Sequence, residues 1–204
     1  VLQEIINMEI GGVLVGLGNP GSQYATTRHN MGFLTLEAFL KAMAKNYRVD
    51  QFSTSKFNGI TFKLTYKNAD WICAFPQTFM NLSGDCVQPL LAWYKVSPEQ
   101  LYVIHDELDL IPGRIQLKKG GGNAGHNGLK SISTRLGTQD YFRLRMGIGR
   151  PKDSAVVSNY VLSGFGQDKE KIENAISLGV IALQDILELG SVKAMNKINM
   201  RKKD

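Results

Sequence analysis

Apolar residues follow two patterns along the chain: short continuous runs, and stripes that recur every three or four positions. The continuous runs Val13–Leu17 and Leu101–Ile104 are typical of strands buried on both faces of a sheet. Ile60–Tyr66 and Trp71–Phe75 are rich in β-branched and aromatic residues, and the turn-forming segment Lys67–Asp70 between them predicts a hairpin. These segments predict the centre of a β-sheet.

The spaced stripes predict amphipathic helices between and after the strands. They occupy the segments Phe33–Met43, Val87–Tyr94, Leu129–Leu136 and Ile172–Leu187. Ser83 is expected to cap the second helix, in which Pro89 should remove one backbone hydrogen bond and bend the axis. Gly137 and Gly190 should end the third and fourth helices. The fourth is expected to be the last helix, followed by a basic tail.

Strands and helices that alternate along the chain indicate the fold class. Arg114–Lys118 and Phe142–Ile148 alternate in polarity and predict two more strands. We therefore expect an α/β fold, with a mixed, mostly parallel twisted sheet that carries helices on both faces. A chain of 204 residues suits a single domain, which we place at residues 8–204. Residues 1–7 precede Met8 and are expected to be an N-terminal extension.

The charge distribution suggests a class of partner. Lys and Arg outnumber Asp and Glu by 24 to 18, which gives a net charge of +6. Between Arg114 and Lys152 the only acidic residue is Asp140, so the basic residues there form one field. Arg143 and Arg145 lie on the same face of a predicted strand. Such a field favours a polyanion such as RNA.

Other features limit where the protein works. No apolar run approaches the roughly 20 residues needed to cross a bilayer, and Val1–Gly12 lacks the pattern of a signal peptide. We therefore expect a cytoplasmic protein with no membrane partner. Cys73 and Cys86 have neither CxxC spacing nor a neighbouring histidine, so we expect reduced, buried thiols.

Three familiar kinds of site fit the sequence poorly. Gly16–Gly21 matches the GxGxxG dinucleotide fingerprint, but Pro20 and the following loop prevent a helix from starting on its last glycine, so no nucleotide cofactor is expected. The GxSxG elbow of serine hydrolases does not occur. A metal site could be drawn from His105, Asp106, Glu107, Asp109 and His126, but these residues lack a metal-site spacing such as HExxH, and no metal is expected.

A histidine and an aspartate are better candidates for chemistry. Asp106 follows the strand Leu101–Ile104, at the edge of an open α/β sheet where ligands gather. His29 follows the first strand by one loop, so the two side chains can meet there. A carboxylate bonded to one ring nitrogen fixes the tautomer and raises the basicity of the other nitrogen. The pair therefore predicts a general base that activates water.

Side-chain amides flank the same segments. Asn19, Asn30, Asn81 and Asn127 offer donors for a developing oxyanion and acceptors for a peptide backbone. Turn formation is the simpler explanation for an asparagine beside a glycine. For Asn127, which precedes Gly128 and a predicted helix, N-capping fits the sequence as well as substrate binding does.

Several of these segments, taken in order, resemble the bacterial-type peptidyl-tRNA hydrolase family. The matching blocks are GLGNPG at 16–21 with Tyr24, TRHN at 27–30, PQTFMNLSG at 76–84, HDELDL at 105–110, GHNGLKSI at 125–132 and RLRMGIGR at 143–150. The resemblance covers Val13 to about Leu189. It implies a monomeric, metal-independent enzyme with a phosphorylase/hydrolase-like fold that cuts the ester between a peptide and the 3′ ribose of tRNA, recycling tRNA from stalled translation.

The resemblance also implies roles for individual residues. His29 corresponds to the catalytic base and Asp106 to its partner. Lys118 and Arg145 correspond to the pair that binds the 5′ phosphate of the tRNA. The residues expected to bind the peptide, the ester and the tRNA end are Asn19, Tyr24, Met80, Asn81, His126 and Asn127.

Two features leave alternatives open. Asn123 and Ala124 stand where the family usually has His and Gly, so the glycine loop should be stiffer and substrate affinity could differ. The family also resembles non-catalytic RNA-binding proteins that serve as splicing cofactors. The presence of His29, Asp106 and the asparagines favours the enzyme over that alternative.

Overall fold

A mixed sheet forms the centre of the computed structural model, which describes residues 9–53 and 56–200. Its strand order is β2-β3-β4-β1-β5-β7-β6. Neighbouring strands from β4 through β1 and β5 to β7 are parallel, and the pairs toward both edges are antiparallel. The strands are β1 (Glu9–Gly16), β2 (Arg48–Ser53), β3 (Gly59–Tyr66), β4 (Ala69–Pro76), β5 (Leu101–Glu107), β6 (Ile115–Lys119) and β7 (Phe142–Gly147).

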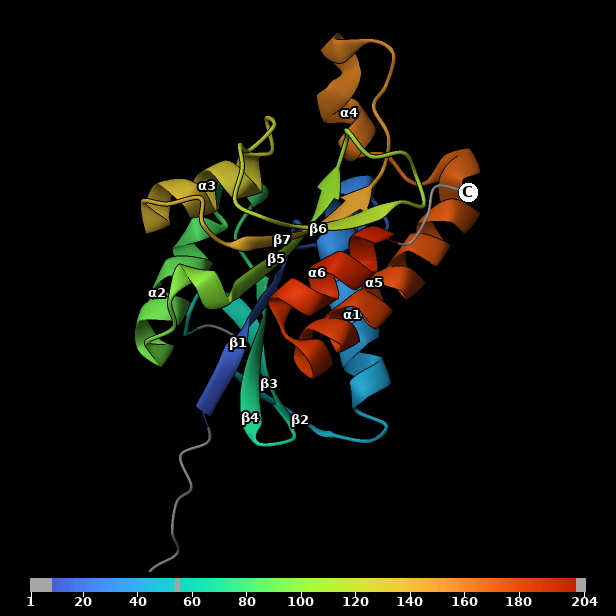
Figure 1. Cartoon of the computed structure of the whole chain (residues 1–204). Helices are drawn as coiled ribbons and strands as arrows, with labels where there is room; N and C mark the ends of the chain where they lie inside the picture. The colour runs from blue at the N-terminus through green and yellow to red at the C-terminus, as the bar shows by residue number, and fades with distance from the viewer. Residues whose placement is uncertain (1–8, 54–55, 201–204) are drawn as a thin grey trace, which may run out of the picture.

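Helices cover both faces of this sheet, as Figure 1 shows, with α1, α5 and α6 on one side and α2 and α3 on the other. The short helix α4 stands beyond one end of the sheet. The helices are α1 (Met31–Met43), α2 (Gly84–Tyr94), α3 (Asn127–Leu136), α4 (Val157–Val161), α5 (Lys169–Leu189) and α6 (Ser191–Met200). The predicted fold class is therefore confirmed.

Short 3-10 turns interrupt the loops that connect these elements. They lie at Ser22–Tyr24, Arg28–Asn30, Met80–Leu82, Pro98–Gln100, Ser154–Val156 and Gly166–Asp168. The loop after β1 contains two of them, so α1 begins ten residues after Gly21. Only a three-residue 3-10 turn follows the last glycine of the GxGxxG pattern, and no α-helix starts there, as the sequence predicted.

Alternate residues of β1 enter two separate cores. Leu14 packs in the core beneath α1 and α5, whereas Val13 and Val15 pack in the core beneath α2 and α3. All three side chains are fully buried. This two-sided burial explains the continuous apolar run at this position. In the part of the chain that the structure describes, no helix is both long and apolar enough to cross a membrane.

The prediction of a basic tail after Gly190 is wrong, because α6 follows. Ala194 and Ile198 of α6 are buried, and the side chain of Asn199 bonds both the N–H and the carbonyl of Leu117 on β6. The apolar residues of α6 are too few and too widely spaced for the sequence to predict a helix there. The edge strand β2 was also missed, because its polar residues lack a clear alternation. Residues 1–7 and 201–204 lie outside the described residues.

The start of α2 differs from the prediction, whereas the position of Pro89 within the helix agrees with it. Ser83 stands at the N-cap position but does not cap, because its hydroxyl donates to the carbonyl of Met80. The N–H of Gly84 instead donates to Oγ of Ser131 on α3, at 2.9 Å. The predicted cap is therefore wrong. Pro89 lies within the helix as predicted, and the helix continues through it.

Close packing at Gly32 brings the predicted catalytic segments together. A Cβ atom there would lie 2.2 Å from the carbonyl oxygen of Ile104 and 2.3 Å from the backbone nitrogen of Leu17. Only glycine lets α1 begin this close to the ends of β1 and β5. As a result, the turn that carries His29 lies beside the end of β5.

Candidate active site

His29 and Asp106 form a direct pair at the carboxyl end of the central strands. Nδ1 of His29 lies 2.9 Å from Oδ1 of Asp106. His29 belongs to the 3-10 turn before α1, and Asp106 lies within β5. The predicted strand ended at Ile104, but β5 extends to Glu107. The structure thus brings the two residues together, although the sequence placed Asp106 just after the strand.

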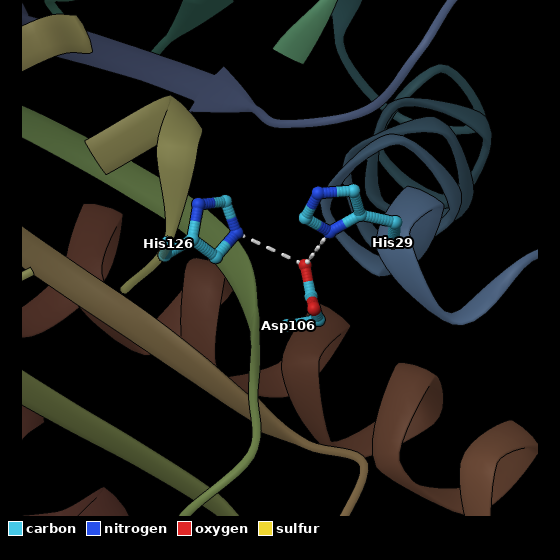
Figure 2. A group of neighbouring side chains, drawn as sticks. All are labelled: His29, Asp106 and His126. Atoms are coloured by element: carbon cyan, nitrogen blue, oxygen red, sulfur yellow. Dashed lines mark hydrogen bonds and ion pairs between the residues drawn. The ribbon is translucent and has the colours of Figure 1, made fainter. Parts of the chain in front are cut away.

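His126 approaches the same carboxylate from the other side. Its Nε2 lies 3.0 Å from Oδ1 of Asp106, so both imidazoles meet at one oxygen, as Figure 2 shows. Nδ1 of His126 accepts bonds from the backbone N–H groups of Gly128 and Leu129. His126 is therefore the N-cap of α3, and the alternative in which Asn127 caps that helix is wrong.

Burial and charge act against each other in this pair. Burial lowers the pKa of His29, but the negative charge of Asp106 and the hydrogen bond to it outweigh that effect and leave the pKa above its usual 6.5. Burial raises the pKa of Asp106, but the two histidines beside it hold that pKa well below its usual range. Asp106 is thus an ionised carboxylate that favours a positive charge on His29.

His105, the third histidine, has a different environment. It is fully buried in β5, and burial is the main reason why its pKa falls to about 3. Its Nδ1 lies 2.7 Å from the carbonyl oxygen of Asp106 and therefore carries the proton. Within the described residues, Nε2 has no hydrogen-bond partner. His105 is therefore a neutral core residue.

A hollow of about 90 Å³ opens above the pair. His29 and Asp106 form one wall of it, and the loop from Asn123 to Asn127 forms another. Helix α4 supplies the third wall through Val157, Ser158 and Val161, and no motif in the sequence had indicated it. That wall adds two apolar side chains and one hydroxyl, and no charge, to the hollow.

Asn19 lies in a network beside the hollow. Its backbone N–H and C=O bond the side-chain amide of Asn30, and its Oδ1 accepts the N–H of Met80 at 2.8 Å. Among the described residues no hydrogen bond of Asn19 Nδ2 is found, and Asn19 does not line the hollow itself. Met80 itself is buried.

Asn81 and Asn127 line a second hollow, of about 380 Å³, between the 3-10 turn at Met80–Leu82 and α3. Asn127 also lines the first hollow and so joins the two. Asn81 is exposed and lies only in the second. Tyr24 is half-buried and lines neither. Of the six expected binding residues, only Asn81, His126 and Asn127 therefore line these two hollows, whereas Asn19, Tyr24 and Met80 do not.

Lys118 and Arg145 share a third, smaller hollow on the other side of His105, together with Arg143. Nε of Arg145 lies 2.8 Å from the Glu107 carboxylate, whereas Lys118 is exposed. The expectation that Arg143 and Arg145 form one open strip is wrong, because Arg143 is buried and donates to the carbonyl of Gly122 at 2.6 Å. It holds the glycine loop in place.

The two unusual residues of the glycine loop have distinct effects. Ala124 has a φ of 47°, in the left-handed region that favours glycine. Oδ1 of Asn123 accepts bonds from Ser133, at 3.2 Å, and from Arg143, at 3.5 Å. The loop is thus tied to α3 and β7.

Arg28, which precedes His29, was not singled out as a functional residue. Its buried guanidinium bonds Ser163, the carbonyl of Phe165 at 3.0 Å and the carboxylate of Asp168 at 3.2 Å, and it lies over the ring of Tyr160. These contacts fasten the segment after α4 beside His29. The TRHN block was the only signal in the sequence for this role.

The donor atoms of His29, Asp106 and His126 lie within 4.8 Å of one another, close enough to raise the question of a metal. Hydrogen bonds already engage each of the atoms that face one another. The sequence candidates Glu107 and Asp109 do not join this group, because they pair with Arg145 and Arg150. The three side chains thus form a hydrogen-bonded cluster centred on Oδ1 of Asp106.

A histidine and an aspartate in contact at the carboxyl end of the central parallel strands of an α/β fold, with side-chain amides nearby, are typical of a hydrolytic enzyme. Comparison with known proteins gives the particular family. Residues 13–204 match the model of the peptidyl-tRNA hydrolase family, and the chain belongs to this family.

Relatives and solved structures agree with this assignment. The chain is 50% identical to the peptidyl-tRNA hydrolase of Desulfovibrio desulfuricans over 179 residues, which are 86% of this chain and 78% of that protein. It is 41% identical over 202 residues to the enzyme of Nitratidesulfovibrio vulgaris strain Miyazaki F, covering 97% and 100%. The crystal structure of the Acinetobacter baumannii enzyme superposes with a TM-score of 0.84 at 37% identity, covering 95% and 98%.

Proposed function

We propose that this peptidyl-tRNA hydrolase cuts the ester between a peptide and the 3′ ribose of tRNA with a water molecule that His29 activates. The observation that carries the mechanism is the 2.9 Å contact between His29 and Asp106 beside a small hollow. The contact uses Nδ1, so Nε2 of His29 is the nitrogen available to take a proton from water.

The reaction needs two proton transfers and no covalent enzyme intermediate. Nε2 of His29 takes a proton from water as the water oxygen attacks the ester carbonyl, and Asp106 stabilises the resulting imidazolium. Amide donors such as Nδ2 of Asn19 stabilise the oxyanion of the tetrahedral intermediate. When the bond to the ribose oxygen breaks, His29 returns the proton to that oxygen. The products are a free peptide carboxylate and a tRNA with its 3′ hydroxyl.

The arrangement of the hollows supports the remaining assignments. We assign the peptide to the side lined by Asn81 and Asn127, with Met80 holding Asn19 in place. We assign the tRNA 5′ phosphate to Lys118 and Arg145, because three basic side chains line their hollow and only one acidic side chain does. Tyr24 is assigned to the tRNA end on the family resemblance. We propose a single domain at residues 8–204, and a cytoplasmic monomer that acts without a metal.

The decisive experiment is release of a blocked amino acid from N-acetyl-aminoacyl-tRNA in the presence of a chelator. Wild-type protein should release it. His29→Ala should be slower by roughly 10²–10⁴-fold, the usual contribution of a general base, with tRNA binding nearly unchanged. An equal rate in the variant would refute the mechanism, and no release by wild type with or without the chelator would favour the non-catalytic alternative. Release by wild type that occurs without the chelator and is lost in its presence would refute metal independence.

The phosphate site has its own test. The preference for a substrate with a 5′ phosphate over the same tRNA treated with phosphatase should shrink in Lys118→Ala. Lys193→Ala, on the exposed side of α6, provides the matched control and should keep the preference. If both variants behave like wild type, the phosphate lies elsewhere.

A further inference from the structure

We propose that His126 is a positioning residue, locked by the N-terminus of α3 as a neutral N–H donor that shares the Asp106 carboxylate with His29. This inference rests on the proposed function, because it concerns how the catalytic pair is held. It changes the role expected for His126, from contacting the substrate to setting the basicity of the group that does the chemistry.

The hydrogen bonds of His126 fix its tautomer. The backbone N–H groups of Gly128 and Leu129 both point at Nδ1, at 3.1 and 3.4 Å. A backbone N–H can only donate, so Nδ1 must be the unprotonated acceptor. Neither the imidazolium nor the Nδ1–H tautomer allows these contacts. Nε2 therefore carries the proton and donates it to Oδ1 of Asp106 at 3.0 Å.

This arrangement leaves no ring nitrogen of His126 for a substrate. One nitrogen caps α3 and the other bonds Asp106, and the ring is largely buried. The residue that follows it, Asn127, projects into both hollows beside the pair. His126 thus connects the start of the helix that presents Asn127 to the carboxylate that orients His29.

Several charged or titratable groups surround His29, and they come from three elements. On β5, Asp106 contacts His29, and Glu107 and the neutral His105 line the same hollow. From α3 the ring of His126 lies with its centroid 5.0 Å from that of His29. On β7, Arg143 and Arg145 stand beyond His105, with Arg145 paired to Glu107. Helix α4 contributes only Val157, Ser158 and Val161 to the hollow.

Asp106 is therefore the dominant charge acting on His29, and His126 is the group that moderates it. An N–H bond to Oδ1 spreads the carboxylate charge and weakens its attraction for a proton on His29. Without that bond, Asp106 would hold the His29 proton more tightly. The imidazole would then lose its proton only at higher pH, and less of the active base would be present near neutrality.

Two substitutions separate the cap from the bond to Asp106. Asparagine is a strong N-cap, and its side-chain oxygen takes the place of Nδ1, but it is too short to reach Asp106. His126→Asn should therefore keep α3 capped and lose the second function. Phenylalanine retains the shape of the ring and loses both contacts. Urea denaturation should show a lower midpoint for His126→Phe than for His126→Asn.

The pH dependence of kcat/KM is the decisive measurement. In both variants the acid limb should move upward by about 0.5 to 1 pH unit, with kcat at pH 7 reduced by roughly tenfold. A role limited to folding would lower the urea midpoint and leave the acid limb in place. NMR of the ¹⁵N-labelled histidine rings of wild type should show His126 as the neutral Nε2–H form.

Three results would overturn the inference. They are an acid limb of His126→Asn at the wild-type pH, a rise in KM alone, and a ring spectrum with the proton on Nδ1. Any of these results would instead support a direct contact between His126 and the substrate. The His29→Ala control separates this failure from failure of the proposed function, because a wild-type rate in that variant would reject the catalytic pair itself.

Discussion

Nδ1 of His29 and Oδ1 of Asp106 are 2.9 Å apart, although 77 positions separate the two residues in the chain. The contact exists because β1 and β5 are parallel neighbours, so the loops and strand ends that follow them reach the same edge of the sheet. A small residue at Gly32 lets α1 begin against that edge.

Removing the charge of Asp106 should impair catalysis while keeping the shape of the site. In Asp106→Asn the amide oxygen can still accept a bond from His29, but it cannot stabilise the imidazolium. We expect kcat to fall by about 10²-fold or more. The acid limb of kcat/KM should move to lower pH, opposite to the His126 variants. Asp109→Asn, an exposed control, should have wild-type kinetics; an unchanged kcat in Asp106→Asn would contradict the role.

Activity and the stability contributed by the catalytic pair should change with pH in opposite directions. The pKa of His29 is raised above 6.5, so kcat/KM should rise with pH and reach half its plateau above that value. The ion pair stabilises the fold below pH 6.5, and this stability is lost as pH rises through the higher folded pKa. Urea titrations of wild type and His29→Gln should therefore converge at alkaline pH. A half-plateau point below pH 6.5 would be inconsistent with the raised pKa.

His105 should make the protein sensitive to acid. Its folded pKa of about 3 lies below the unfolded value of 6.5, so the unfolded chain binds the proton first as the pH falls. This residue alone should remove roughly 1 kcal/mol of stability for each pH unit between those values. His105→Asn keeps a donor for the Asp106 carbonyl and removes the titration, so its stability should fall less steeply with acid. Parallel curves for the two proteins would disprove this account.

Loss of Arg28 should loosen the cover of the active site. Arg28→Met leaves the carbonyl of Phe165 and the carboxylate of Asp168 without their partner, which should destabilise the fold by roughly 2 to 4 kcal/mol. Amide hydrogen exchange over residues 157–168 should become faster, and kcat/KM should fall because α4 no longer keeps the third wall of the hollow in place. Lys169→Met, nearby and exposed, is the control. Unchanged exchange in the Arg28 variant would show that another contact holds this segment.

The sequence by itself determined the parts of this protein that depend on neighbours in the chain. The apolar run of β1 had to be a strand buried on two sides, and the hairpin between β3 and β4 followed from Lys67–Asp70. Gly137 ends α3 in a left-handed conformation, as expected. The blocks around His29 and Asp106 were sufficient to indicate the family, because their order is more specific than any one motif.

Only the tertiary structure decided what depends on residues distant in the chain. The burial that keeps His105 neutral comes from strands and helices packed around β5, and its sequence neighbours are polar. His126, and not Asn127, caps α3, and the contact of its ring with Asp106 on β5 holds it in that position. In the same way, Ala194 and Ile198 make α6 a helix only by packing against the rest of the domain. A pattern within one segment of the sequence cannot predict such contacts, because the free energy that stabilises them comes from the packing of two elements that are distant in the chain.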